Sequence, residues 1–215
     1  MQYIISILPP LLEGFKLTLE IFVATIIFSI PIGFFLALSR ISSFKMLSGI
    51  TGFYIWLLRG TPLMLQLLFF YFALPGMGIL LSDFSAALFA FSLNYAAYFA
   101  EIFRAGIQSI DRGQYEAAKT LGFTYPQTMR NIIMPQVTRH ILPPVSNEII
   151  TLVKDTSLIY VLAMNDLMRM TRTIVQRDFN TMPFIVAACF YLGMTLVLTW
   201  VFKKMEEHYS AYDEN

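Results

Sequence analysis

Apolar residues are gathered into windows of about twenty positions that are separated by shorter polar stretches. A helix needs about 20 mostly apolar residues to cross roughly 30 Å of hydrocarbon. Five windows have this character: Thr18 to Leu38, Phe53 to Ala73, Ser85 to Ala105, Leu142 to Met164 and Phe184 to Phe202. The pattern predicts an all-α, polytopic membrane protein with about five transmembrane helices.

Two apolar stretches depart from a simple span. The fourth window contains Glu148, Lys154 and Asp155, but it is rich in Ile, Leu and Val and is too long for a turn. We therefore keep it as a span. Ahead of the first window, Tyr3 to Leu12 is apolar but short, and Pro9 and Pro10 interrupt it. Proline breaks helix hydrogen bonding, so we expect an interfacial segment here that does not cross the membrane.

Composition supports membrane insertion and excludes several classes of protein. Hydrophobic residues make up 57% of the 215 positions and charged residues 13%, about half of the roughly 25% in soluble domains. The net charge of +1 gives no field for nucleic acid. Cys189 is the single cysteine, which excludes an intrachain disulfide and a multi-cysteine metal site. No metal site and no cleavable leader are expected.

Sequence motifs also argue against catalysis by this chain. It contains no Gly-x-x-x-x-Gly-Lys-[Ser/Thr] phosphate loop, no His-Glu-x-x-His and no Gly-x-Ser-x-Gly. We therefore expect a non-enzyme that binds no ATP itself and carries no cofactor of its own.

Basic residues predict the orientation in the membrane. Five spans place the termini on opposite sides, and cytoplasmic segments are enriched in Lys and Arg. With the N-terminus outside, the inner segments hold Arg40, Lys45, Arg59, Arg104, Arg112, Lys119, Arg130, Arg139, Lys203 and Lys204. The outer segments hold Lys16, Arg169, Arg172 and Arg177. We therefore expect the C-terminus in the cytoplasm and treat residues 1–215 as one transmembrane domain.

The segment from Ile107 to His140 is too long for a hairpin connection and too polar to span. It is expected to form two short helices on the cytoplasmic face. The first covers Gln114 to Leu121 and ends at Gly122, and the second begins after an N-cap at Thr124 and runs to about Met134. Pro135 is expected to end it, and Pro143 with Pro144 to mark the return into the membrane.

This loop resembles the signature loop of the inner-membrane permeases of binding-protein-dependent ABC importers. The matching positions, with Met134 in the place of a leucine, are Glu116, Ala117, Ala118, Gly122, Ile132 and Pro135. The resemblance implies a type I importer permease fold, with these six residues coupling the chain to a cytoplasmic ATPase that binds ATP and Mg²⁺. Small alanines suit a helix that lies in a groove of a partner, and glycine suits the turn. The alternative is an ordinary amphipathic surface loop.

Three further motifs narrow the resemblance to the polar amino acid branch of this family, which includes histidine, arginine, glutamine and cystine permeases. They are Arg59 to Leu63, Tyr98 to Ile107 and Lys154 to Leu158. The resemblance implies a polar amino acid substrate, a bacterial plasma (inner) membrane, an extracytoplasmic solute-binding protein and a second permease copy, either identical or a paralogue. It does not specify the amino acid.

Polar residues within the spans are the candidates for substrate binding, because ionisable groups in a membrane usually face a cavity or a partner. Asn94, Tyr98 and Glu101 share one face of the third span, and Glu148, Thr151 and Asp155 share one face of the fourth. An amino acid needs an acceptor for its ammonium and donors for its carboxylate. The predicted substrate-binding residues are Asn94, Tyr98, Glu148, Thr151, Asp155, Thr156 and Ser157, with Asp155 or Glu148 at the ammonium and Asn94, Thr156 or Ser157 at the carboxylate.

Each of these residues also has a purely structural interpretation. Asp155 can pair with Lys154, Glu101 can pair with Arg104, and Asn94 can form a hydrogen bond between helices. Tyr98 suits packing, and Arg59 suits anchoring at the inner surface. A rival function is a membrane channel or scaffold whose cytoplasmic loop binds a regulator without ATP.

Overall fold

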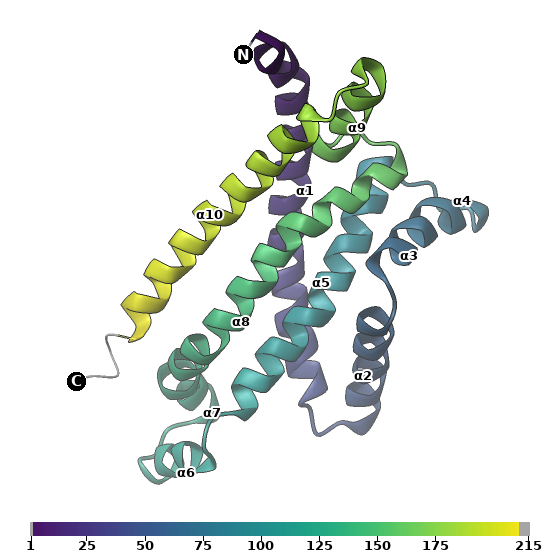
Figure 1. Ribbon diagram of the computed structural model, residues 1–215. Coiled ribbons are helices and arrows are strands. Elements are labelled where there is room, and N and C mark those ends of the chain that lie inside the picture. The colour runs from purple at the N-terminus through teal and green to yellow at the C-terminus, as the bar shows by residue number, and fades with distance from the viewer. Residues whose placement is uncertain (1, 211–215) are drawn as a thin grey trace.

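The computed structural model describes residues 2–210, and every regular element in that range is helical (Figure 1). The α-helices are α1 Gln2–Arg40, α2 Lys45–Gly60, α3 Leu63–Leu68, α4 Leu74–Gly76, α5 Asp83–Gln108, α6 Arg112–Thr120, α7 Tyr125–Thr128, α8 Met134–Asp155, α9 Leu167–Asp178 and α10 Met182–Ser210. Phe69–Ala73 and Met129–Ile133 form π-helical turns, and Thr156–Leu162 is a 3-10 helix. The all-α prediction is confirmed.

Helix α5 lies at the centre of the bundle and contacts α1, α2, α3 and α8. Its aromatic residues Phe91, Tyr95, Phe99 and Phe103 recur every four positions, so they form one buried stripe. On α1, a Cβ atom at Gly33 would lie 2.7 Å from the Cβ of Phe99. Only glycine permits this approach, which is why α1 can pack so closely along α5.

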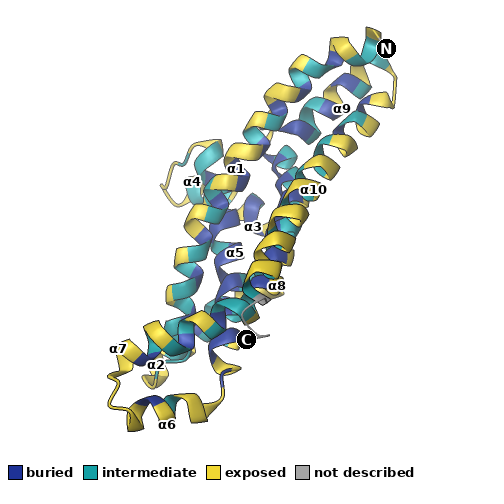
Figure 2. Ribbon diagram, turned by 90° about the vertical axis from the view of Figure 1, so that its left-hand side faces the viewer, coloured by how far each residue is buried: buried dark blue, intermediate teal, exposed yellow. Residues whose placement is uncertain are grey.

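The two ends of the bundle differ. Figure 1 shows the N-terminal end of α1 beside α9 at one end, and α6, α7 and the C-terminal end of α10 at the other. The predicted coupling loop, at about residues 107–140, therefore lies at the end opposite to the start of α1. Exposed residues extend along the outer sides of α1 and α10 (Figure 2). On α10 they are largely apolar, as is typical of a lipid-facing helix.

Three helices, α1, α5 and α10, are long and apolar enough to cross a membrane. A fourth crossing is possible if α2 and Leu63–Gly76 count as one span, since they are bent by 104° at a short break. Helix α8 lies beside α5 and α10 but is too polar to satisfy the same description. By length and composition, the number of crossing helices among the described residues is thus three or four.

The interruption expected at Pro9 and Pro10 is wrong, because Tyr3 to Leu12 are the beginning of the continuous helix α1. The helix continues through both prolines, and Ile7 and Leu11 are buried against α9 and α10. Tertiary packing therefore outweighs the hydrogen bonds that proline removes. At about 1.5 Å per residue, 39 residues extend about 58 Å, well beyond a 30 Å hydrocarbon layer.

The second expected span, Phe53 to Ala73, is not one continuous helix. Helix α2 ends at Gly60, and α3 begins at Leu63 in a different direction. Thr61 and Pro62 are extended between them. The hydrophobic pattern did not show this bend, because apolar residues continue on both sides of it.

The expectation that Pro135 ends the second loop helix is also wrong. Pro135 lies in the first turn of α8, and the chain stays helical from Tyr125 to Leu162, through Pro143 and Pro144. The backbone N–H of Met134 donates to the carbonyl of Met129, five residues back. This wider π-type hydrogen bond is the last one before Pro135. Proline has no N–H, and in the first turn of a helix an N–H would have no intrahelical partner.

Helix α9 fills the segment between the fourth and fifth expected spans, and its 12 residues are too few to cross a membrane. Its N-cap is Asp166, whose carboxylate accepts backbone N–H groups from Met168 at 2.9 Å and Arg169 at 3.1 Å. The hydroxyl of Thr18 on α1 accepts the N–H of Leu167 at 3.2 Å. Burial raises the pKa of Asp166 to about 6, and the two backbone hydrogen bonds oppose this shift.

The raised pKa of Asp166 predicts a pH dependence of stability. Because the folded protein holds the proton more tightly than the unfolded chain, whose ordinary value is 3.8, this group stabilises the fold below pH 4. That contribution, at most about 3 kcal/mol, is lost as pH rises through 6. Melting temperatures of Asp166→Asn and wild type, measured from pH 4 to pH 8, should differ in slope over this window. Parallel curves would contradict the assignment.

Candidate functional site

Three structural elements enclose the candidate site. They are the break between α2 and α3, the C-terminal half of α5, and the half of α8 that precedes the 3-10 helix. Two adjoining pockets lie between them, and Arg59, Tyr98 and Glu148 line both. We name them after a carboxylate that each contains: the Glu101 pocket, of about 660 Å³, and the Asp155 pocket, of about 620 Å³. Both volumes suit a small molecule.

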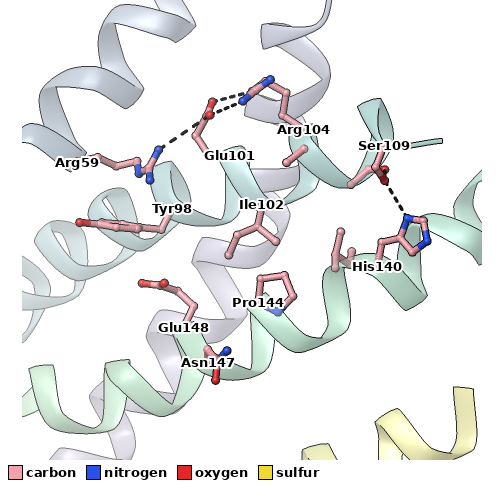
Figure 3. Close-up of a pocket in the computed structure, with 13 residues that line it drawn as sticks. Arg59, Tyr98, Glu101, Ile102, Arg104, Ser109, His140, Pro144, Asn147 and Glu148 are labelled. Atoms are coloured by element: carbon pink, nitrogen blue, oxygen red, sulfur yellow. Dashed lines mark hydrogen bonds and ion pairs between the residues drawn. The ribbon is translucent and has the colours of Figure 1, made fainter. Parts of the chain in front are cut away.

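The Glu101 pocket is lined by charged and polar groups from α2, α5 and α8. Arg104 binds the Glu101 carboxylate with two hydrogen bonds, from Nε at 3.0 Å and from Nη2 at 2.7 Å. Arg59 lies 4.0 Å from the same carboxylate, and its guanidinium lies 5.1 Å from the centre of the Tyr98 ring. Figure 3 shows Arg59, Tyr98 and Glu148 converging from the three helices. Glu101 is thus paired with arginine, as the structural interpretation of this residue proposed.

The Asp155 pocket combines Arg59 with two carboxylates, Glu148 and Asp155, on one face of α8. Asp155 Oδ2 accepts a hydrogen bond of 2.8 Å from the hydroxyl of Tyr95 on α5. Among the described residues, neither a hydrogen bond nor an ion pair satisfies Glu148, and no ion pair joins Asp155 to Lys154. The pocket therefore offers one cation and two carboxylate groups.

Asn94 lies at the α2–α3 side of this pocket and is buried. Its amide nitrogen donates to the carbonyl of Leu58 at 3.0 Å and to Oε1 of Gln66 at 3.0 Å. Both amide hydrogens are therefore used within the protein. The hydrogen bond between helices that was one interpretation of Asn94 is present, and only its carbonyl oxygen remains for other partners.

The structure brings together five of the seven predicted substrate-binding residues: Asn94, Tyr98, Glu148, Thr151 and Asp155 all line the Asp155 pocket. It does not place Thr156 or Ser157 in the pocket lining. Their hydroxyls donate to backbone carbonyls, Thr156 to Val153 and Ser157 to Lys154, each at 2.6 Å. Thr156 and Ser157 follow Asp155 by one and two positions, about 100° and 200° around a helix, so they lie off the face that carries Glu148, Thr151 and Asp155.

Sequence reasoning missed two residues of the site and undervalued a third. Tyr95 lies next to Asn94 on α5 and was assigned no role, although it binds Asp155. Gln66 is an isolated polar residue within an apolar run, four positions after Pro62, and that isolation was an available signal. Arg59 was interpreted as an anchor at the inner surface, but the break after Gly60 directs it into both pockets.

The predicted coupling loop forms its first expected helix as α6, with small shifts of the ends, and its second helix begins after Thr124 as expected but continues into α8. Helix α6 begins after Asp111, whose carboxylate accepts the N–H of Gly113. Gly122 has φ +81°, a left-handed conformation that favours glycine. The N–H of Thr124 donates to the side-chain oxygen of Gln127 at 2.9 Å at the start of α7, so the predicted N-cap is confirmed.

The six motif residues of this loop divide by exposure. Glu116, Ala117, Gly122 and Pro135 are exposed, Ile132 is half-buried, and Ala118 packs inside the loop. Leu121 and Tyr125 beside the turn are also largely exposed, at 74% and 67%. The turn between α6 and α7 therefore presents apolar side chains to its surroundings, which is typical of a surface that binds a partner.

Comparison with known proteins places the chain among transport proteins. Residues 29–210 match the family model described as "Binding-protein-dependent transport system inner membrane component". The chain is 40% identical over 208 residues to the arginine transport system permease protein ArtQ of Bacillus subtilis, covering 96% of this chain and 95% of that protein. It is 40% identical over 195 residues to the glutamate/aspartate import permease protein GltK of Escherichia coli, covering 87% of each.

Solved structures agree with these sequence relatives. A crystal structure of an amino acid ABC transporter with histidines superposes with a TM-score of 0.89 at 35% identity, covering 96% of this chain and 97% of that one. The inward-facing MetNI methionine ABC transporter has a TM-score of 0.72 at 15% identity, covering 97% of this chain and 98% of that one. The second likeness is one of fold alone.

Proposed function

Because this chain belongs to the family of binding-protein-dependent transport system inner membrane components, we propose that its Asp155 pocket is where the transported amino acid binds. The chain is a membrane-embedded permease subunit of an amino acid ABC importer. The observation that carries the proposal is the presence of Arg59, Glu148 and Asp155 in one pocket, since an amino acid carries one charge of each sign.

The free hydrogen-bonding groups of the pocket suggest how the substrate is oriented. Asn94, Thr156 and Ser157 already donate their hydrogens within the protein, so none of them has a donor left for a carboxylate. Arg59 retains donors and lines the pocket. We therefore place the substrate carboxylate at Arg59 and the ammonium at Asp155 or Glu148.

We further infer that the Glu116 to Pro135 loop binds a separate cytoplasmic ATPase, which holds ATP and Mg²⁺. The helical backbone is unbroken from α7 through α8 to Leu162, so it joins the loop to the helix that carries Glu148 and Asp155. Movement of the loop would thus reach the pocket directly. In this account, a rocking motion driven by the ATPase opens the pocket alternately to the two membrane faces.

The remaining partners and the orientation belong to the same proposal. A second permease copy, identical or a paralogue, completes the path, and an extracytoplasmic solute-binding protein delivers the substrate. The N-terminus lies outside and the C-terminus in the cytoplasm, which is supported by the opposite positions of the start of α1 and the end of α10 (Figure 1). Basic residues near α6, α7 and the α1–α2 turn support the same orientation.

Asp155→Asn tests the binding role of the pocket. Asparagine keeps an oxygen that can accept from Tyr95, so the fold should persist while the charge is lost. Loss of a charge-assisted hydrogen bond should weaken substrate binding by about 1.5 to 3 kcal/mol, roughly ten- to a hundredfold. Substrate-dependent ATP hydrolysis by the reconstituted importer gives the affinity. Glu20→Gln, on the exposed side of α1, is the matched control and should change nothing.

Lys154→Met separates binding from a structural role of Asp155. If Asp155 only neutralises Lys154, then Asp155→Asn should lower the melting temperature, and adding Lys154→Met should restore both stability and affinity. That pattern would refute the binding role.

Ion current through the reconstituted chain in the absence of ATP hydrolysis would instead support the rival function as a channel.

Gly122 tests the coupling role of the loop. The left-handed backbone at this position disfavours β-branched residues but tolerates asparagine, and no atom lies within 4 Å of a Cβ built there. Gly122→Val should therefore distort the turn and reduce ATPase binding or substrate-stimulated ATP hydrolysis severalfold, whereas Gly122→Asn should retain most of both. Normal transport by Gly122→Val with the ATPase still bound would place the dock elsewhere.

A further inference from the structure

The bend between α2 and α3 leaves the last backbone carbonyls of α2 without helical partners, and at Leu58 the cause is a proline. In a continuous α-helix, the carbonyl of Leu58 would accept the N–H of residue 62. Residue 62 is proline and has no N–H. Buried side chains, Gln66 and Asn94, lie against this carbonyl, so its hydrogen-bond donor is expected to come from the protein.

Two side-chain amides supply the missing donor. Nε2 of Gln66, one turn into the following helical segment, donates to the Leu58 carbonyl at 2.8 Å, and Nδ2 of Asn94 on α5 donates to it at 3.0 Å. Nε2 of Gln66 also lies 2.8 Å from the hydroxyl oxygen of Thr61, which in turn donates to the carbonyl of Leu57. Gln66 thus spans the break and joins its two sides.

The orientation of both amides follows from their partners. A carbonyl only accepts, so each nitrogen must face Leu58. The Oε1 of Gln66 then accepts the second hydrogen of Asn94 at 3.0 Å. Gln66 and Asn94 are 7% and 4% exposed, so water cannot easily substitute for either bond. With both hydrogens of Asn94 held, its Oδ1 is the one polar atom left to the pocket.

We propose that Gln66 is a positioning residue for substrate binding. Through its bond to Leu58, Gln66 sets the direction in which α2 ends and therefore the position of Arg59, the next residue. Through its bond to Asn94, it holds the acceptor oxygen of Asn94 toward the Asp155 pocket. Gln66 itself is absent from the lining of that pocket, so it acts through Arg59 and Asn94. This inference rests on the proposed binding of the amino acid in the same pocket.

Gln66→Met tests the role directly, because methionine keeps the length of the side chain and removes both its donor and its acceptor. The reconstituted importer with its ATPase is assayed with radiolabelled L-arginine, L-glutamine and L-glutamate, and the amino acid carried best is titrated. The half-saturating concentration should rise about tenfold, with the maximal rate within twofold of wild type. A purely structural role would instead lower the yield and melting temperature and leave half-saturation unchanged in the folded protein.

Gln66→Glu should make substrate affinity depend on pH, which a simple loss of packing would not do. A protonated glutamic acid can donate to Leu58 and accept from Asn94, whereas the ionised form would face the carbonyl with acceptors only. Relative to wild type at each pH, this variant should approach normal half-saturation at pH 5 and lose affinity at pH 8. An equal defect at both values would count against the positioning role.

The matched control is Gln136→Met. Nε2 of Gln136 donates to the carbonyl of Ile132, four residues back, but this glutamine lies outside both pockets. Its half-saturating concentration should stay at the wild-type value. If Gln66→Met also binds normally while Asp155→Asn does not, the pocket stands and the positioning role fails. If neither variant weakens binding, both the proposed site and the role of Gln66 are overturned.

Discussion

The missing amide hydrogen of Pro62 is the constraint on which the candidate site depends. A partly buried backbone carbonyl needs a hydrogen-bond donor, and the carbonyl of Leu58 has two, on Gln66 and Asn94. These bonds stabilise a bend of 104° where a hydrophobic profile alone predicts a straight span. The bend ends α2 beside the centre of α5, and Arg59 therefore points into the bundle.

Two faces of the central helix α5 have different roles, one in packing and one in lining the pockets. Its aromatic stripe, from Phe91 to Phe103, fills the core against α1, and Gly33 permits that close packing. The face that includes Asn94, Tyr98 and Glu101 is turned toward the break and toward α8. Because a rigid, buried helix carries these polar groups, their positions are fixed before any substrate arrives, which lowers the cost of binding.

Much of this arrangement could be predicted from the sequence, because it follows from local patterns. Apolar windows located α1, α5 and α10, and helical spacing placed Asn94 with Tyr98 and Glu148 with Thr151 and Asp155 on shared faces. A glycine after a run of helix formers predicted the turn at Gly122, which has the expected left-handed backbone. These features depend on residues within one or two helical turns of each other.

The errors have physical causes that lie beyond such local patterns. Prolines were taken as helix ends, but packing carries α1 through Pro9 and Pro10, and a π-turn admits Pro135. Thr156 and Ser157 lie off the helix face of Asp155, and their hydroxyls donate to the backbone carbonyls of Val153 and Lys154, partners that the side-chain pattern does not show. The partners of Gln66 and Tyr95 lie on other helices, at Asn94 and Asp155, so only the tertiary structure reveals their roles.

We propose that one amino acid binds between the broken helix and α8. The most direct measurement is a structure of the assembled importer with the transported amino acid bound. Density is expected in the Asp155 pocket, with the substrate carboxylate within hydrogen-bonding distance of Arg59 and its ammonium beside Asp155 or Glu148. Density outside this pocket, or a bound molecule with its carboxylate directed at Asp155 and its ammonium at Arg59, would contradict it.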